Sequence, residues 1–488
     1  MGSNTNAISI TRKKDFSAWY HEVIAAADLA DRSSVRGCMV IKPWGYAIWE
    51  NMQRVLDAKF KELGVMNCYF PMFTPIDLFA KEASHISGFA KEMAVVTHSR
   101  IENIDGKLVP TSPIETPLAV RPTSEMIIGE SFARWVESYR DLPLLVNQWC
   151  NVVRWEMRTR MFLRTTEFLW QEGHTAHETE TEAVVLAKKI HELYNWFITD
   201  VLKIYAIMGE KPDHEKFPGA VTTYTMEAMM QDGKALQCAT SHYLGTNFAK
   251  AVEIKFQSRN GGLDFAHTTS WGITTRMIGG LIMAHGDDNG INTPLEVAPY
   301  HIVIIPIIKN ERSRAEILEY CEKIKISCSS HRVLIDIKDT SSQNKRWDYI
   351  RKGVPIICEI GERDINGRSI AFTRRQPKIL KDSCEFDAFS HVVNQILEEH
   401  DAALYSKSVE LNTSKTEKNI KNFEEMKEFF SNEMPGFVMA KWSGNGLSLL
   451  DKIGVSIRCT PVKSEKSDGK CILTGEKADT DYIFARSY

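Results

Sequence analysis

The chain has 488 residues, of which 43% are hydrophobic and 25% charged, the composition of a globular protein with about two to four domains. Its 60 Lys and Arg residues against 63 Asp and Glu residues give a formal net charge of −3, which excludes the strong positive charge of many nucleic-acid-binding proteins. No apolar run is long enough to span a bilayer, and the ten cysteines form no Cys-x-x-Cys pair, so we expect a cytoplasmic protein with reduced thiols and no membrane contact.

The N-terminal part alternates helical and strand-like patterns. Apolar residues at helical spacing predict amphipathic helices over 15–36 and 44–63. Short apolar runs that close on proline predict strands over 37–43 and 67–71. The second helix and the strand after it are either a dimer interface or an ordinary helix–strand unit.

A hairpin is predicted over 86–122, with a proline-punctuated loop at 111–117. A helix follows over 124–139, which places Thr123 and Glu125 near a helix N-terminus. Side chains there either face a ligand or simply cap the helix.

Residues 147–177 predict two strands joined by a charged loop. Arg154 and Glu156 stand at the end of the first strand, and Phe168 opens the second. Arginine presents a planar fork of donors to phosphate oxygens, and an aromatic ring offers a face for a base. The segment therefore fits a polyphosphate nucleotide, with a surface hairpin and an ordinary ion pair as the alternative.

Three further segments precede a change of pattern near residue 298: a predicted helix over 178–208, a small and polar run over 237–245, and a strand end and buried helix over 268–286. His242 alone is more often a structural histidine than a catalytic one. Arg276 stands just before an apolar helix, where a cation usually needs an anionic partner.

From residue 301 to about 400, strands alternate with helices, which predicts a βαβ-like domain of compact size. Residues 331–381 contain 12 Lys and Arg and 6 Asp and Glu, with Trp347 and Tyr349 among them. Such a basic, aromatic surface either binds RNA or is a solvated face. The polar residues 405–420 are interpreted as a linker or mobile loop.

The order and spacing of four segments resemble the class II prolyl-tRNA synthetases of the eukaryotic/archaeal type, and the resemblance covers nearly the whole chain. Motif 1 resembles residues 42–49 through 69–71, the Thr-x-Glu loop 121–125, motif 2 151–156 with 162–174, and motif 3 270–276.

The resemblance implies a multidomain α/β and α+β protein. Residues 1–298 would form a class II catalytic domain built on an antiparallel sheet, 299–405 an α/β anticodon-binding domain, and 406–488 a small α+β C-terminal domain. In the anticodon-binding domain, relatives often have a Pro-Gly pair where this chain reads Ser342-Gln-Asn-Lys345. That departure leaves the base contacts open.

The implied reaction joins L-proline and ATP into prolyl-adenylate, releases pyrophosphate, and transfers proline to the 3′ end of tRNA(Pro). The catalytic residues would be Arg154, Glu156 and Arg276, with Arg154 on the α-phosphate and Arg276 on the far phosphates. Mg²⁺ would bridge phosphates near Gln237, since it keeps several waters and few protein ligands. The other ATP-binding residues would be Arg164, Thr165, Phe168, Thr240 and Thr274.

The family pocket would take the prolyl ammonium on Thr123 and Glu125. The remaining proline-binding residues would be Arg154, Trp170, Glu172, His174, Thr240, His242 and Phe89. Missing methylenes alone separate proline from alanine by about 1–3 kcal/mol. Ser270 comes only 95 positions after Thr175, so no built-in editing domain is expected.

Relatives commonly hold zinc with four C-terminal cysteines, whereas this chain has Cys459 and Cys471 alone, so no zinc is expected. A homodimer through 44–63 is expected from the family, and the terminal Tyr488 is expected to fold toward the active site. One alternative is another class II synthetase. The other is a catalytically inactive synthetase-like tRNA-binding regulator, which predicts losses among Arg154, Glu156, Gln237 and Arg276; all four residues are present.

Overall fold

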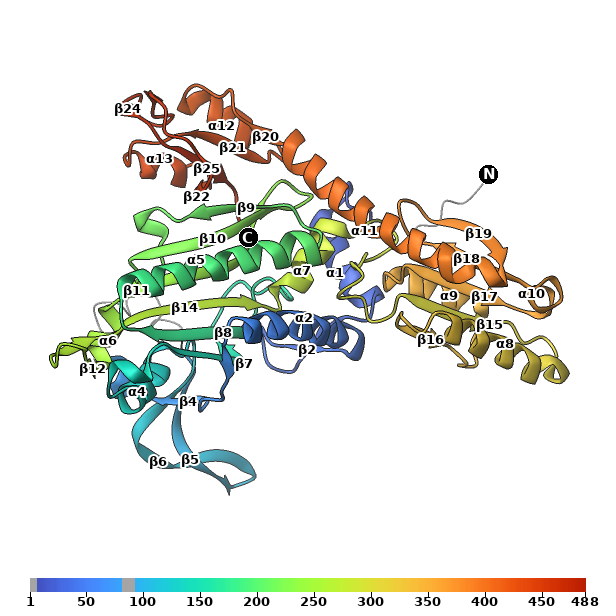
Figure 1. Cartoon of the computed structure of the whole chain (residues 1–488), viewed down its shortest axis with the longest axis horizontal. Coiled ribbons are helices and arrows are strands. Elements are labelled where there is room, and N and C mark those ends of the chain that lie inside the picture. Colours follow the sequence, from blue (N-terminus) through green and yellow to red (C-terminus); the bar gives the residue numbers. More distant parts are fainter. Residues whose placement is uncertain (1–6, 81–92) are drawn as a thin grey trace.

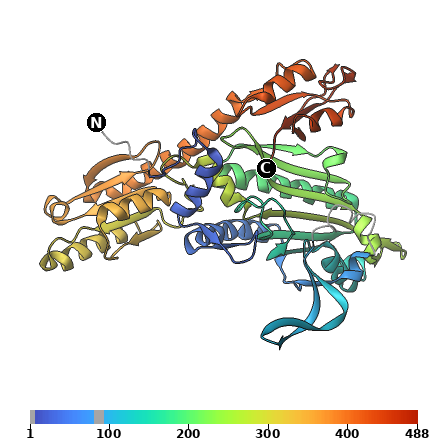
Figure 2. The same ribbon diagram turned by 180° about the vertical axis from the view of Figure 1, so that it is seen from behind.

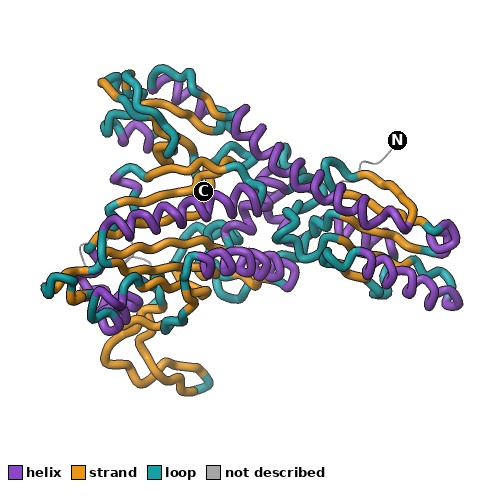
Figure 3. Tube along the Cα trace, viewed as in Figure 1, coloured by secondary structure: helices purple, strands orange, loops and turns teal. Residues whose placement is uncertain are grey.

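The computed structural model of the chain describes residues 7–80 and 93–488. A large sheet with its helices forms one part of the molecule, and a smaller sheet forms a second part at the other end (Figure 1). The helix α11 (Phe389–Ser414) leaves the smaller sheet and runs back along the body to the C-terminal strands (Figures 1 and 3).

The large sheet has 11 described strands in the order β20-β21-β25-β22-β9-β10-β11-β14-β8-β7-β3. Neighbouring strands are antiparallel, except that β20 with β21 and β3 with β7 are parallel pairs. The predicted antiparallel sheet is thus confirmed. The strands are β3 (Met66–Asn67), β7 (Leu144–Val153), β8 (Glu167–His177), β9 (Ala206–Glu210), β10 (Thr222–Met229), β11 (Ala235–Gly245), β14 (His267–Thr274), β20 (Thr416–Glu417), β21 (Phe437–Lys441), β22 (Ser456–Pro461) and β25 (Asp481–Ala485).

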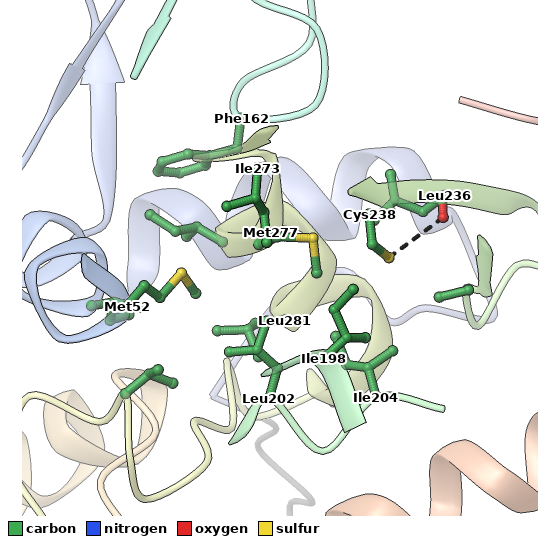
Figure 4. Packing of buried hydrophobic residues seen from close by; sticks show 14 of the residues in the cluster. Met52, Phe162, Ile198, Leu202, Ile204, Leu236, Cys238, Ile273, Met277 and Leu281 are labelled. Carbon is green, nitrogen blue, oxygen red and sulfur yellow. Dashed lines mark hydrogen bonds between the residues drawn. The ribbon is translucent and has the colours of Figure 1, made fainter. Parts of the chain in front are cut away.

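Helices pack on one face of this sheet, where apolar strand residues such as Met226 and Trp271 contribute to the main hydrophobic core. On β14, Trp271 packs against Phe60 of α2 (Pro43–Glu62), with ring centroids 4.9 Å apart, and α5 (Glu180–Trp196) brings Tyr194 to the same Phe60. Beside them, Met277 and Leu281 of α7 (Arg276–His285) pack into the same core (Figure 4). The opposite face carries polar side chains such as Glu172 and His174 of β8.

Some N-terminal helices and strands have nearly the predicted bounds, and others end at different residues. The helix predicted over 44–63 is confirmed as α2. The first helix, α1 (Phe16–Ala26), stops ten residues early, because Asp28 adopts a left-handed φ of 60° and the chain turns into the strand pair β1 (Ala30–Arg32) and β2 (Met39–Ile41). The strand over 67–71 is shorter than predicted and forms the edge strand β3.

The predicted hairpin is confirmed as β5 (Val95–Ile104) and β6 (Lys107–Val120), and it projects from the body (Figure 2). The loop expected at 111–117 is wrong, since these residues belong to β6. Prolines are tolerated because the ribbon is exposed and its register shifts between Val96 and His98. The neighbouring elements are α3 (Ile76–Ala80), α4 (Glu125–Trp135), α6 (Asn247–Val252), β4 (Phe73–Pro75), β12 (Lys255–Gln257) and β13 (Leu263–Phe265).

The second sheet has the order β16-β15-β17-β18-β19. The strands β16, β15 and β17 are parallel and are connected by helices, which confirms the βαβ pattern. The pairs β17 with β18 and β18 with β19 are antiparallel. The elements are β15 (Ile302–Pro306), α8 (Arg314–Ser327), β16 (Val333–Ile335), α9 (Ser342–Arg351), β17 (Ile356–Ile360), α10 (Glu362–Gly367), β18 (Ser369–Arg374) and β19 (Leu380–Glu385).

The basic, aromatic surface expected at 331–381 is only partly present. Tyr349 is buried and donates its hydroxyl to Asp336 at 2.9 Å, so it offers no stacking face. Several cations of the segment are also paired with acids inside the fold, as in Lys345 with Asp336. The local charge count therefore overstates the charge that faces solvent.

The linker expected at 405–420 is wrong, because α11 runs through it to Ser414. Leu404, Ser408 and Asn412 recur every four residues and are buried along one side of the helix. Ser408 accepts the backbone N–H of Tyr205 at 2.9 Å, so its hydroxyl serves packing. The remaining C-terminal elements are α12 (Phe423–Ser431), α13 (Leu447–Asp451), β23 (Gly469–Lys470) and β24 (Lys477–Ala478).

Candidate active site

A cavity of about 460 Å³ lies on the face of the large sheet opposite α2 and α5. Every described residue that the sequence assigned to the site lines it, whereas Phe89 lies outside the described residues. The lining residues among these are Thr123, Glu125, Arg154, Glu156, Arg164, Thr165, Phe168, Trp170, Glu172, His174, Gln237, Thr240, His242, Thr274 and Arg276.

Strand alternation explains why these residues meet. Side chains two apart on a strand share a face, so Phe168, Trp170, Glu172 and His174 of β8 all face the cavity. Glu172 stands opposite Gly272 of β14. A Cβ at Gly272 would lie 3.0 Å from the carbonyl oxygen of Gln171 on β8, so glycine allows the two strands to pair closely at this point.

Arginines dominate one end of the cavity. Arg154 donates its backbone N–H to Thr166 at 2.8 Å and Nε to the carbonyl of Pro122 at 2.9 Å, and its guanidinium lies 5.6 Å from the ring centroids of Phe168 and of Trp170. These contacts fix the guanidinium before any ligand binds.

Glu156 orders the loop between β7 and β8. Its carboxylate accepts Nε of Arg164 and the backbone N–H of Arg158, both at 2.9 Å. Farther along the loop, the guanidinium carbon of Arg160 lies 4.6 Å from the ring of Tyr20 and 5.3 Å from that of Tyr488. The terminal residue therefore reaches the loop that carries Arg164.

Arg276 opens α7 at the same end. Its Nε donates to the carbonyl of Leu163 at 3.1 Å and its Nη1 to the carbonyl of Gln237 at 3.4 Å. Burial, and then the positive charge of Arg154, lower the pKa of Arg276. Two half-buried guanidinium groups that repel each other make this end a site for a polyanion.

Carboxylates dominate the other end. Thr123 donates its hydroxyl to Glu125. The buried Glu172 accepts Oγ of Ser124 at 2.5 Å and Nε2 of His174 at 2.9 Å. Burial alone would lower the pKa of His174, but its bond to Glu172 raises it above the usual value. This end therefore favours a cation over an anion.

His242 forms the wall next to the carboxylates. Its Nδ1 lies 3.0 Å from Oγ1 of Thr223, and its ring centroid lies 4.7 Å from that of Phe217. Burial, helped by His174, lowers the pKa of His242 to about 3. The imidazole is neutral at pH 7 and too weak a base to hold a proton there.

One wall of the cavity, the loop after β9, is not predicted from the sequence. Lys211, Glu215, Lys216, Phe217 and Pro218 all line the cavity. Their only sequence signal is a Pro-Gly turn directly before the strand pattern of β10.

The described residues contain no group of three or more His, Cys, Asp or Glu side chains placed to hold a metal ion. Cys459 and Cys471 are buried in two different hydrophobic clusters. The cavity does offer the neutral amide of Gln237 and hydroxyl of Thr240, which fit a Mg²⁺ ion that arrives on phosphates with most of its waters.

Comparisons with known proteins identify the family. The tRNA synthetase class II core domain (G, H, P, S and T) matches residues 111–285, the anticodon binding domain matches 301–396, and the prolyl-tRNA synthetase C-terminal domain matches 423–488. The proline–tRNA ligase of Protochlamydia amoebophila is 51% identical over 499 residues, which cover 99% of this chain and 98% of that protein. The chain belongs to the class II prolyl-tRNA synthetases.

Other relatives agree. The proline–tRNA ligases of Paramagnetospirillum magneticum and Bdellovibrio bacteriovorus are 48% and 49% identical, and each match covers 99% of both chains. These relatives are bacterial, so they give no support to the eukaryotic/archaeal assignment. In this synthetase β7 to β11 and β14 of the large sheet belong to the class II core, and the five-stranded sheet belongs to the anticodon-binding domain. The C-terminal domain contains α12 and the strands β21, β22 and β25 at one end of the large sheet.

Proposed function

We propose that this synthetase activates L-proline with ATP to prolyl-adenylate, releases pyrophosphate, and transfers the prolyl group to the 3′ end of tRNA(Pro). The observation that carries this proposal is a single cavity with guanidinium groups at one end and carboxylates at the other. Such a cavity fits a polyphosphate at the guanidinium end and an amino group at the carboxylate end, with the reacting carboxylate of the amino acid between them. The relatives' printed activity supports the same conclusion.

At the guanidinium end, Arg154 holds the α-phosphate and the prolyl carboxylate, and Arg276 holds the far phosphates. Phe168 stacks on adenine, with Arg164, Thr165 and Thr274 around the nucleotide, and Glu156 orders Arg164. The carboxylate of proline attacks the α-phosphorus, and pyrophosphate leaves. No general base is required, because the carboxylate is ionised at neutral pH, so catalysis rests on positioning and on stabilising the growing negative charge.

At the carboxylate end, Thr123 and Glu125 take the prolyl ammonium, backed by the hydrogen-bonded pair of Glu172 and His174. The ring of proline lies against uncharged walls made by Trp170, Thr240, the neutral His242 and Phe217. Phe89 stays a predicted wall residue.

A Mg²⁺ ion would be held by Gln237, with Thr240 beside it. When bound, it supplies positive charge that neutralises the triphosphate. The chain's own part is to present neutral oxygen ligands next to Arg154 and Arg276, which orient the phosphates.

The activity is tested by proline-dependent ATP–pyrophosphate exchange without tRNA, with threonine, glycine and alanine as competing substrates. Exchange with proline should exceed that with the others, and Arg154→Ala should abolish it. Exchange with another amino acid would favour a different class II synthetase. No exchange from folded protein that binds tRNA would favour the inactive regulator.

We further propose that the domains divide at 1–298, 299–405 and 406–488, and that the chain is of the type without an editing insertion. Between β8 and β14, α5, β9, β10 and β11 are parts of the core or the cavity wall, and α6, β12 and β13 pack with α4 in a further hydrophobic cluster. This arrangement supports the second point. The three relatives named above are matched over 98–99% of their own lengths, so they are of similar size.

We also propose a homodimer through α2 and the edge strand after it. Met66, Tyr69 and Phe73 follow α2 and are 63%, 73% and 42% exposed, an apolar surface that a partner would cover. Sedimentation equilibrium at micromolar concentration should give twice the chain mass, and a pure monomer would contradict the proposal.

No described helix is both long and apolar enough to cross a membrane. The cytoplasmic location stays a prediction.

A further inference from the structure

A buried cluster of three charged side chains lies between the C-terminal domain and the cavity. Lys211 follows β9, Glu227 lies on β10, and Arg458 comes from β22 of the C-terminal domain. Nζ of Lys211 is 2.8 Å from Oε1 of Glu227, and Nε of Arg458 is 3.1 Å from Oε2 of Glu227. The side chains of Lys211, Glu227 and Arg458 are 2%, 0% and 8% exposed. One carboxylate therefore holds two cations that come from different domains.

Stability alone does not explain this cluster, since well-packed apolar residues often do as well as a buried ion pair. Burial by itself would raise the pKa of Glu227, but Lys211 and Arg458 lower it, so the carboxylate stays ionised. Oγ1 of Thr225 donates to the same carboxylate at 3.0 Å. A carboxylate with this many donors has one orientation, and it fixes the groups bound to it.

The fixed groups continue into the cavity wall. Lys211 lines the cavity and donates its backbone N–H to the carbonyl of Thr223 at 2.9 Å. The backbone N–H of Phe217, in the same loop, donates to Oγ1 of Thr223 at 3.0 Å, and this hydroxyl also contacts His242 at 3.0 Å. Displacement of Lys211 would therefore displace Phe217 and Thr223, the two neighbours of His242.

We propose that Arg458 is a positioning residue for proline binding. It holds Glu227 and, through it, Lys211, so that the loop after β9 forms the wall beside His242. The C-terminal domain thereby shapes the active centre without touching a substrate. This inference rests on the proposed function, which places proline at this end of the cavity.

Arg458→Met tests the proposal, because methionine keeps much of the volume and removes the charge. In tRNA-free exchange the KM for proline should rise about tenfold or more, since small displacements of a positioning wall are costly. The KM for ATP should change less than about threefold, because β8, β14 and α7 hold the nucleotide. Arg458→Lys restores a cation and should return the KM for proline to near the wild-type value.

Lys441→Met is the matched control. Lys441 pairs with Asp481 at 3.3 Å inside the C-terminal domain, so its loss should lower the melting temperature and leave the KM for proline unchanged. A KM for proline within twofold of wild type in folded Arg458→Met would overturn the proposal. The proposal would also be overturned if the KM for proline and the KM for ATP rose by the same factor in Arg458→Met, and equally in Lys441→Met.

If Arg458→Met yields no folded protein, Lys211→Met decides the question, because it removes the link between Glu227 and the loop after β9. It should raise the KM for proline and change the KM for ATP less than about threefold. A KM for proline within twofold of wild type in folded Lys211→Met would overturn the proposal. Wild-type protein without proline-dependent exchange would instead overturn the proposed function, so the two failures are distinguishable.

Discussion

The anticodon-binding and C-terminal domains are joined to the catalytic core in different ways. The anticodon-binding domain has its own sheet and its own hydrophobic cluster, and none of its described strands pairs with the large sheet. The C-terminal domain continues the large sheet, since Thr460 of β22 pairs with Glu210 of β9. It also shares a core with it, in which Met229 packs with Phe437 and Ile483.

This difference suggests a division of labour. A separately folded domain that contacts the core through side chains can change without altering the cavity. A domain whose strands continue the sheet shares the backbone positions that shape the cavity wall. We therefore expect changes at the first junction to affect tRNA charging, and changes at the second to affect activation itself.

The largest effect on stability is expected at the first junction. Arg375 is buried and binds Asp287 through two bonds of 2.7 and 2.6 Å. Arg375→Met leaves the carboxylate without this partner and should lower the free energy of unfolding by about 3 kcal/mol. Calorimetry measures this loss, and tRNA prolylation should fall more than tRNA-free exchange. An equal fall in both activities would contradict the separation of the domains.

A somewhat smaller loss of stability is expected at the second junction. A Cβ at Gly209 would lie 2.4 Å from Sγ of Cys459 and 2.9 Å from the carbonyl of Thr460. Gly209→Ala should therefore force β9 and β22 apart, destabilise the protein by about 1–3 kcal/mol and impair exchange. Gly262→Ala, whose Cβ would meet only Oγ of Ser258 at 3.7 Å, is the control. Unchanged exchange in Gly209→Ala would show that the sheet junction does not shape the site.

On α11 we expect a substitution that stabilises the protein, by an amount that depends on pH. Burial raises the pKa of Asp401 to about 6, although its carboxylate accepts the N–H of Leu295 and lies near Lys203. The folded pKa exceeds that of the unfolded chain, about 3.9, so the folded state binds more protons between these values. Its contribution to stability is full below pH 4 and lost as the pH rises through 6.

Asp401→Asn should therefore raise the free energy of unfolding at pH 8 by on the order of 2 kcal/mol and have little effect at pH 4. Urea unfolding at the two pH values measures this difference. A loss of stability at pH 8 would mean that the attraction of Lys203 outweighs burial.

The smallest effect is expected at the chain end. The hydroxyl of Tyr488 donates to Asp232 at 2.5 Å, and its ring lies beside Arg160. Tyr488→Phe removes the hydrogen bond and keeps the ring, so it should cost about 1 kcal/mol and leave the KM for ATP near wild type. Tyr488→Ala also removes the ring and should raise that KM. Equal KM values for ATP in the two variants would show that the ring of Tyr488 does not position the loop that carries Arg160 and Arg164.

The resemblance identified residues such as Trp170 and Glu172, and strand alternation explains why their side chains share one face of β8. The wall that includes Phe217 was not predicted, since a loop position shows no periodicity and its contact with His242 depends on strand pairing. The linker prediction failed for a related reason. Polar residues such as Ser408 suggest a loop by composition, yet they lie on the buried side of α11 and bond to the core. Local pattern cannot report such long-range contacts.

The most direct test of the different junctions is the KM for proline in tRNA-free exchange, measured side by side for the wild type, Arg458→Met and Arg375→Met. We expect a rise of about tenfold in Arg458→Met and a value near wild type in Arg375→Met. Equal values in the two variants, or a rise confined to Arg375→Met, would contradict the proposed difference between the junctions.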